Sequence, residues 1–419
     1  MGNRAWISIT AFLLCGALAS CGSTAETARG GPATTVSIAG TWQVHRVGEP
    51  FSQSVAGISC VNQNLCYAIT SSTANLSMRT PGLATITASG MRTTPLTHWV
   101  YGSIACTSNG ACWLPYLDGI YRLHRSKLAS VQYSNFTGPV GSCVDPSKFC
   151  LSIITCHSDT ECLGVDWSQF ATIGNAVAPS PKVAMYNGAI WKVVSLPGVP
   201  VSTSICVYEC QINPSQPVCF SQTDCSIEGT YWLEADHLPV PYTVTYSWNG
   251  AAWSASGSTA HVAVAGRYCY DSSLCWIWGQ DSASSHGPFL GAEALYGGKS
   301  HSLRFPFSTN SAVPYGCLSI VECGVSAISC VSQATCWIAG LTLGNEPFLL
   351  RWNQTGSSAP SVQKIDVNLP GRVSSIVCPS STYCVAIGGE LTANTCSGYE
   401  CAPKPVDHPF YAVFRSAGS

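Results

Sequence analysis

A pair of cysteines with five residues between them recurs seven times along this chain. The clearest copy is Cys330 with Cys336, in the segment AISCVSQATCWIAG, where short β-prone runs enter the first cysteine and leave the second. Successive copies begin 46 to 63 residues apart. The other six pairs are Cys60 with Cys66, Cys106 with Cys112, Cys156 with Cys162, Cys219 with Cys225, Cys269 with Cys275, and Cys378 with Cys384. Recurrence at such an interval is typical of repeat architectures, in which each copy is one supersecondary unit.

Each repeat also contains a second hairpin signal. In Val183 to Val194 and in Val244 to Ser256, two β-prone runs meet at Asn-Gly. This dipeptide favours a two-residue turn because both central residues can take positive φ. A unit is therefore predicted to hold four strands, with the cysteines joining the first two and Asn-Gly joining the last two. Four-stranded units that repeat radially form a β-propeller.

The two ends of the chain complement each other. Pro409 to Ser419 matches the third strand of a unit, whereas Thr41 to Val47 matches the fourth. Pairing them would close the ring and remove the exposed edges of an open sheet. The predicted fold is all-β: residues 41–419 form a seven-bladed β-propeller with one short disulfide hairpin per blade, closed by pairing of the N- and C-terminal strands.

The first 40 residues have a different character. Residues 1–20 contain one basic residue followed by an uncharged apolar run, which indicates a secretion signal too short to span a bilayer permanently. The segment LASC, Leu18 to Cys21, resembles the lipobox of bacterial lipoproteins, and this resemblance implies that Cys21 is lipidated and begins the mature protein. Ordinary cleavage that leaves Cys21 as a free thiol is the alternative. Residues 21–40 are small, polar and aperiodic, as in a flexible tether.

The number of cysteines predicts a complete set of disulfides. Without Cys15 and Cys21, 22 of the 24 cysteines remain, an even number that suits an oxidising compartment. Four further pairs stand close in the sequence: Cys143 with Cys150, Cys206 with Cys210, Cys317 with Cys323, and Cys396 with Cys401. Zinc binding by the closely spaced pairs and a redox role are alternatives, but neither the spacing nor a neighbouring base favours them.

Composition narrows the function. Charged residues make up 10% of the chain, the net charge is −2, and no basic cluster occurs, which argues against a nucleic-acid partner. No cofactor or metal motif is found, so no cofactor is predicted.

Candidate binding residues lie on the face of the ring that carries the long connections. These include Gly164 to Pro181, Glu228 to Pro241, Gly279 to Ala292 and Gly388 to Pro409, and functional loops concentrate on such faces. The densest groups of aromatic and titratable residues there are Tyr231, Trp232, Glu234, Asp236 and His237, followed by Trp278. A solvated loop without function is the alternative interpretation. Tryptophans such as Trp191 and Trp253 are expected in the core between blades.

The pattern resembles exported bacterial propellers with BNR (Asp-box) repeats and sortilin-like propellers. The resemblance rests on the cysteine hairpins and on NGxxW turns such as Asn187 to Trp191, and it implies the fold alone, because Asn replaces the Asp of an Asp box and Gly follows at once. We therefore expect a non-catalytic lipoprotein on the extracytoplasmic face of a membrane, whose loop face binds an envelope protein or a glycan. A hydrolase or lyase acting on carbohydrate, with a carboxylate pair such as Glu234 and Asp236, is the alternative.

Overall fold

The computed structural model describes β-structure throughout. The described residues are 40–46, 53–72, 81–96, 100, 102–116, 119–124, 127–131, 133, 149, 151, 153–166, 181–198, 213–214, 216–235, 238–259, 262–281, 289–296, 299–303, 324–342, 346–354, 361–391 and 405–416. Their strands belong to one compact unit, Val36–Ser419. Among these residues no helix has the length and hydrophobicity needed to cross a bilayer.

The strands of the described residues form seven antiparallel sheets. Six sheets contain four strands and one contains five. The first three sheets are β2 (Gln53–Asn62), β3 (Leu65–Ser72), β4 (Gly82–Thr87) and β5 (Gly90–Pro95); β6 (Ala105–Cys106), β7 (Ala111–Tyr116), β8 (Gly119–His124) and β9 (Lys127–Val131); and β10 (Ile153–Ser158), β11 (Glu161–Val165), β12 (Lys182–Tyr186) and β13 (Trp191–Ser195).

The other four sheets follow in chain order. They are β14 (Asn213–Pro214), β15 (Val218–Ser221), β16 (Asp224–Ala235), β17 (Leu238–Trp248) and β18 (Trp253–Thr259); β19 (Val262–Asp271), β20 (Leu274–Asp281), β21 (Phe289–Tyr296) and β22 (Lys299–Leu303); β23 (Gly324–Ser332), β24 (Thr335–Leu341), β25 (Pro347–Asn353) and β26 (Ser361–Lys364); and β27 (Gly371–Ser380), β28 (Tyr383–Leu391) and β29 (Pro405–Ser416) with β1 (Gly40–Arg46).

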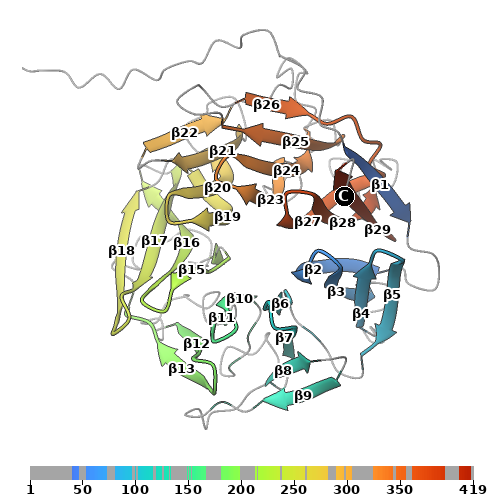
Figure 1. The fold of residues 1–419 in the computed structure, drawn as a ribbon. Helices are drawn as coiled ribbons and strands as arrows, with labels where there is room; N and C mark the ends of the chain where they lie inside the picture. Colours follow the sequence, from blue (N-terminus) through green and yellow to red (C-terminus); the bar gives the residue numbers. More distant parts are fainter. Residues whose placement is uncertain are drawn as a thin grey trace, which may run out of the picture. The chain divides into compact units, whose positions relative to one another are not determined.

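The sheets are arranged radially. In each one, the strand that enters the first cysteine contacts the neighbouring sheet, and these contacts connect all the sheets into a ring. Figure 1 shows these strands, among them β2, β19 and β27, innermost, with the remaining strands of each sheet following outward. Such an arrangement is a β-propeller.

The strand β1 completes the last sheet. It pairs with β29 in a continuous antiparallel register from Gly40 opposite Ser416 to Arg46 opposite Phe410. Trp42 on β1 packs edge-on against Trp337, with ring centroids 5.4 Å apart, and also contacts Phe414. The N-terminal strand thus contributes a tryptophan to the junction with the β23–β26 sheet.

Hydrophobic cores lie between the sheets. Trp113 packs edge-on against Trp191, and Trp276 against Trp352, with ring centroids 5.4 and 5.2 Å apart. All four tryptophans are buried. Trp253 is half-buried against another core cluster, so the expectation that Trp191 and Trp253 belong to the core between blades is confirmed.

The predicted ring of seven equivalent blades needs correction. The described residues form only six hydrophobic clusters between sheets, and no such cluster joins the β14–β18 sheet to the β19–β22 sheet. The β14–β18 sheet also contains five strands instead of four. Six four-stranded blades and one irregular five-stranded sheet therefore replace the regular seven-bladed propeller that the repeats predicted.

The Asn-Gly turns also differ from the prediction. Tyr186 pairs with Trp191, and Trp248 pairs with Trp253, so each loop has four residues instead of two. In the second loop, Asn249 Oδ1 accepts hydrogen bonds from the amides of Ala251 and Ala252 at 3.0 and 2.9 Å. Gly250 takes a positive φ of 89°, and an added Cβ there would lie 2.5 Å from Thr223 Cγ2 in the cysteine hairpin of the same sheet. The asparagine side chain thus satisfies amides that a tighter turn would pair through the backbone.

We predict that Trp42→Ala weakens ring closure. The substitution removes the contacts with Trp337 and Phe414 from a half-buried position, and it should lower the free energy of unfolding by about 2 kcal/mol. Urea unfolding followed by tryptophan fluorescence measures this change. Gln43→Ala, at an exposed position of the same strand, is the control and should change it by less than about 0.5 kcal/mol. Equal effects of the two substitutions would contradict the role assigned to Trp42.

Candidate functional site

The seven repeated cysteine pairs are disulfides. Their Cα atoms lie 3.8 to 4.1 Å apart across the hairpins. These bonds indicate an oxidising, extracytoplasmic environment. The four further predicted pairs lie outside the described residues, as do Cys21, the signal of residues 1–20 and nearly all of the tether. Each bridge closes a short loop and contributes about 2 kcal/mol in the chain-entropy model, so their number matters more than any single one.

Five of the seven described disulfide turns are stiffened by a polar side chain in the same position. In five of the seven described turns, the residue two positions after the first cysteine accepts a hydrogen bond from the amide two positions further on. The acceptors are Asn62, Ser158, Ser221, Asp271 and Ser332. The turns are therefore held by a side chain as well as by the bridge.

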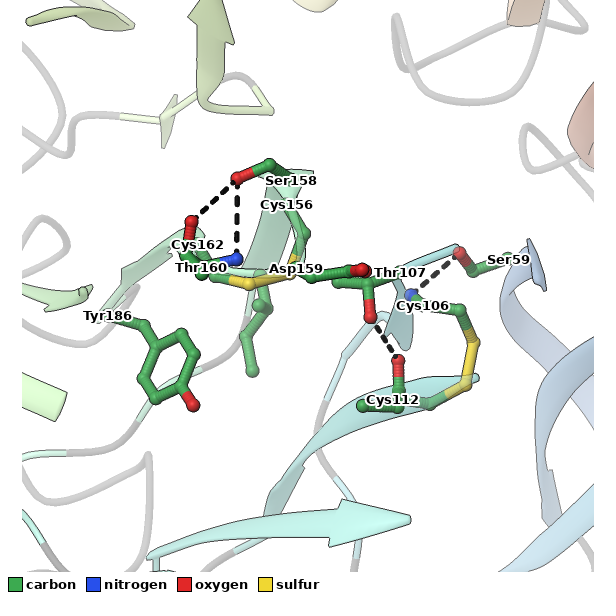
Figure 2. The surroundings of a disulfide bond; sticks show 12 residues. Ser59, Cys106, Thr107, Cys112, Cys156, Ser158, Asp159, Thr160, Cys162 and Tyr186 are labelled. Atoms are coloured by element: carbon green, nitrogen blue, oxygen red, sulfur yellow. Dashed lines mark hydrogen bonds between the residues drawn. A yellow bond between two sulfur atoms is a disulfide. The ribbon is translucent and has the colours of Figure 1, made fainter. Parts of the chain in front are cut away.

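Neighbouring turns also bind each other. The amide of Cys106 donates to Ser59 Oγ at 2.9 Å, and the amide of Cys378 donates to Ser329 Oγ at 3.0 Å. Figure 2 shows the first of these bonds, together with Asp159, which accepts a hydrogen bond from the amide of Asn109 at 3.1 Å. The serine that precedes the first cysteine thus connects one innermost strand to the next.

Asp271 forms the most connected of these contacts. Its Oδ2 accepts a hydrogen bond of 2.6 Å from Gln333 Nε2 in the neighbouring sheet, and its Oδ1 accepts bonds from Ser273 and from the amide of Leu274. Partial burial acts to raise the pKa of Asp271, but the hydrogen bonds from Gln333, Ser273 and Leu274 outweigh it, and the pKa lies below its ordinary value. The ionised carboxylate is therefore the form that joins the two turns.

The predicted candidate residues Tyr231, Trp232 and Glu234 lie on β16. This strand pairs with β17 up to Ala235 opposite Leu238, so most of the predicted loop Glu228 to Pro241 is a hairpin. Among the described residues, the pairs from Trp232 opposite Pro241 to Ala235 opposite Leu238 extend beyond the last pairs with β14 and β18. We call this two-stranded extension, residues 232–241, the finger. It lies at the end of the sheet opposite the disulfide turn, and Asp236 and His237, between its strands, lie outside the described residues.

Trp278 is separate from the finger. It lies on β20 directly opposite Gly266, where an added Cβ would clash with the indole ring. The ring packs against the cluster between the β19–β22 and β23–β26 sheets and is half-buried. The structure thus gives Trp278 a packing role and does not bring it together with the other candidate residues.

Sequence reasoning missed a charged pair at the junction between the β14–β18 and β19–β22 sheets. Arg267 Nη1 on β19 lies 3.2 Å from Glu228 Oε1 on β16 and donates a hydrogen bond to Ser226 Oγ at 2.9 Å. The exposed fractions of Arg267 and Glu228 are 8% and 9%, and Arg267 Nε and Glu228 Oε2 are buried without a hydrogen-bond partner in the described part of the chain. One signal was visible: the residue after the second cysteine is Trp113, Trp276 or Trp337 in three repeats, but Ser226 here.

Within the described residues, no group of three or more His, Cys, Asp or Glu side chains is arranged to hold a metal ion. Among the described residues, Glu228 and Arg267 form an ion pair between two sheets, and Arg46 Nε lies 2.7 Å from Glu390 Oε1 within the sheet that β1 completes.

Comparisons with known proteins give similarity at the level of the fold. No family model and no curated protein matches the sequence. The chain is similar to the solved structure of YCF48 bound to D1 peptide, with 10% identity, a TM-score of 0.47, and coverage of 90% of this chain and 97% of that one. It is also similar to the β-propeller domain of the Trilobed protease from Pyrococcus furiosus, with 8% identity, a TM-score of 0.49, and coverage of 82% and 96%. A third is polysaccharide lyase Uly1, with 9% identity, a TM-score of 0.48, and coverage of 86% and 90%.

The depressed pKa of Asp271 predicts a pH-dependent contact between two turns. Because the folded-state pKa lies below the unfolded one, the stabilisation is complete above the unfolded value and is lost as the pH falls through the folded value. Asp271→Asn should therefore lower the free energy of unfolding by about 0.5 kcal/mol at neutral pH, a small value because the pair is partly exposed. The difference from the wild type should disappear in acid, measured by urea unfolding at a series of pH values.

Gln333→Ala provides the matched test of the same contact. It removes the donor from the neighbouring sheet, so it should reduce the pH dependence and lose little further stability when combined with Asp271→Asn. Full additivity of the two substitutions would show that the contact does not stabilise the fold.

Proposed function

We propose that the protein is a lipid-anchored, extracytoplasmic binding protein that presents the finger to an envelope protein or glycan. The observation that carries the proposal is that the predicted candidate residues Trp232 and Glu234 lie on a two-stranded extension beyond the other strands of their sheet. A contact element on a rigid scaffold loses little conformational entropy on binding.

The rest of the ring supplies the rigidity. Bridged turns, hydrogen bonds between turns, and the aromatic contacts between sheets fix the base from which the finger extends. The described side chains between the sheets pack into hydrophobic clusters, whereas the finger extends beyond the other strands of its sheet. This division favours binding through the finger over catalysis by the ring interior.

The membrane anchor is proposed from the sequence alone. The resemblance of Leu18 to Cys21 to a lipobox supports lipidation of Cys21, and the disulfides support an exported protein. A tether of about 19 residues, with a span of about 24 Å, would let the ring tilt while keeping it close to the bilayer.

Finger shortening tests the binding function. Replacing residues 232–241 by a two-residue Asn-Gly turn keeps the sheet register up to Tyr231 opposite Tyr242 and should abolish cross-linking of the intact protein to envelope components in the native membrane. The matched control replaces the exposed loop residues Ala251 and Ala252 at the other end of the same sheet by serine, and it should leave cross-linking unchanged. Equal cross-linking by all three proteins would refute the finger as the contact site. Release of reducing sugars or unsaturated sugars from envelope polysaccharide would instead support the hydrolase or lyase alternative.

Cys21→Ser tests the anchor. The variant should leave the membrane fraction and appear in the soluble fraction, with unchanged thermal unfolding because the ring begins at β1. Membrane fractionation measures the distribution, and Cys15→Ser, within the predicted signal, is the control that should stay membrane-bound. A Cys21→Ser protein that also stayed in the membrane fraction would disprove anchoring through this residue.

A further inference from the structure

The outer rim of the ring consists of the last strand of each sheet. In the described part of the chain these strands are β5, β9, β13, β18, β22, β26 and β1. Figure 1 shows β18 as the outermost strand of its sheet, at the rim of the ring. The free side of an edge strand presents backbone N–H and C=O groups that can pair with another chain, and proteins protect such edges with charged residues or proline.

Six of these seven outer strands contain a lysine or an arginine. The residues are Arg92 on β5, Lys127 on β9, Lys192 on β13, Lys299 on β22, Lys364 on β26 and Arg46 on β1. In contrast, β18 has the sequence WSASGST, without a charged residue or a proline. Where β17 extends beyond β18 into the finger, it contains Pro239 and Pro241, which cannot donate a backbone hydrogen bond to an added strand. Among the described strands, β18 is therefore the outer edge that lacks this protection.

The edge of β18 is regular and accessible. The strand pairs with β17 along all of its seven residues without a bulge. Ser254, Ser256 and Gly257 are exposed. Their small size lets a second backbone approach to the distance at which strands pair.

The two sides of β18 have different chemistry. Trp253 and Ala255 pack against the cluster shared with the β10–β13 sheet, whereas Ser254 and Ser256, which alternate with them, are exposed on the other side. The edge has no charge that could neutralise a charged partner. It therefore favours an uncharged strand whose small or apolar residues alternate with polar ones.

The sequence of β18 itself meets these requirements. In an antiparallel pair of two copies centred on Ser256, this serine lies opposite its own copy, Ala255 lies opposite Gly257, and Ser254 lies opposite Ser258. Residues opposite each other are on the same side of a sheet, so this register continues both sides of β18 across the pair. It also uses all seven residues of the strand, because Ser256 is the middle one.

The other outer strands fit this edge less well. Each would bring a lysine or an arginine to β18, which offers no carboxylate in return. Pairing of β18 with β18 uses the same edge of both copies, so the contact closes as a two-fold dimer and does not propagate into a fibre.

We propose that β18 binds β18 of a second copy of this chain, so that two rings join at their rims through one continuous antiparallel sheet. The dimer rests on neither the finger nor the membrane anchor. The finger-shortened variant should therefore dimerise like the parent protein, and failure of the finger as a binding element leaves the dimer unaffected.

Sedimentation velocity of the purified mature protein tests the dimer, with Cys21→Ser in every variant so that no lipid drives association. The average mass should rise from monomer towards dimer as the concentration increases, because a contact of one strand pair is small and binds weakly. Ser256→Lys places two like charges opposite each other and should weaken association at least about tenfold. Thr94→Lys, at an exposed position of the outer strand β5, is the matched control and should leave association unchanged.

A cross-link locates the contact. Ser256→Cys should form a disulfide between two copies on oxidation, because residues directly opposite in an antiparallel pair lie within disulfide reach. Thr94→Cys is the control and should remain monomeric on a non-reducing gel. Thermal unfolding of all these variants should match that of the parent protein, because both positions are exposed.

Three results would overturn the proposal. A protein that stays monomeric at every concentration would show that the edge of β18 does not bind a second copy. Association that Ser256→Lys leaves unchanged would place the contact elsewhere on the ring. A photo-reactive amino acid at position 256 that cross-links a different protein in the native membrane, and no second copy, would assign this edge to that protein.

Discussion

Closure by the pairing of β1 with β29 is the constraint on which the other contacts depend. Each sheet of the ring packs against two neighbours, so the first and the last sheet each keep one face unpacked until the ring closes. The last sheet contains β27, β28 and β29 from the end of the chain, and its fourth position is filled by β1 from the beginning. With that strand in place, the β23–β26 sheet gains Trp42 as a neighbour for Trp337. Without it, β29 would be an exposed edge of the kind that invites aggregation.

Two kinds of contact then hold the closed ring at different radii. Near the innermost strands, the disulfide turns and the serine-to-amide bonds connect one sheet to the next over short distances. Further out, edge-on tryptophan pairs fill the wedge between sheets, and Arg122 and Arg351 lie over Trp113 and Trp337. The wedge widens outward, and a large aromatic ring covered by a long side chain fills it better than a small aliphatic residue would. Such edge-on pairs lie at three junctions, whereas the described clusters on the two sides of the β2–β5 sheet contain no tryptophan and are filled by tyrosine and aliphatic side chains.

The sequence predicted the parts of this fold that local chemistry determines. The cysteine spacing identified the disulfide hairpins, and the match of the two chain ends identified the strand that completes the last sheet. Asn187 and Asn249 were assigned to tighter turns than they form, because turn length depends on whether a side chain replaces a backbone acceptor. Trp278 looked like a surface aromatic, and only the pairing with Gly266 shows that its ring has space to pack. The Glu228–Arg267 pair was missed because its partners lie in different sheets, and a sequence pattern does not report contacts between repeats.

The register of β1 against β29 has a consequence for how the protein is made. Every disulfide hairpin joins cysteines six positions apart, so each can form as soon as its own repeat leaves the export channel. The ladder from Gly40 to Arg46 must instead wait for β29, the strand of the described ring that lies furthest from β1 in the sequence. Contacts so distant in sequence form slowly, because a long loop must be closed before any of them is gained. Pairing of β1 with β29 therefore distinguishes complete rings from truncated ones. A chain truncated before β29 can still form its disulfide hairpins, but its β1 has no partner strand.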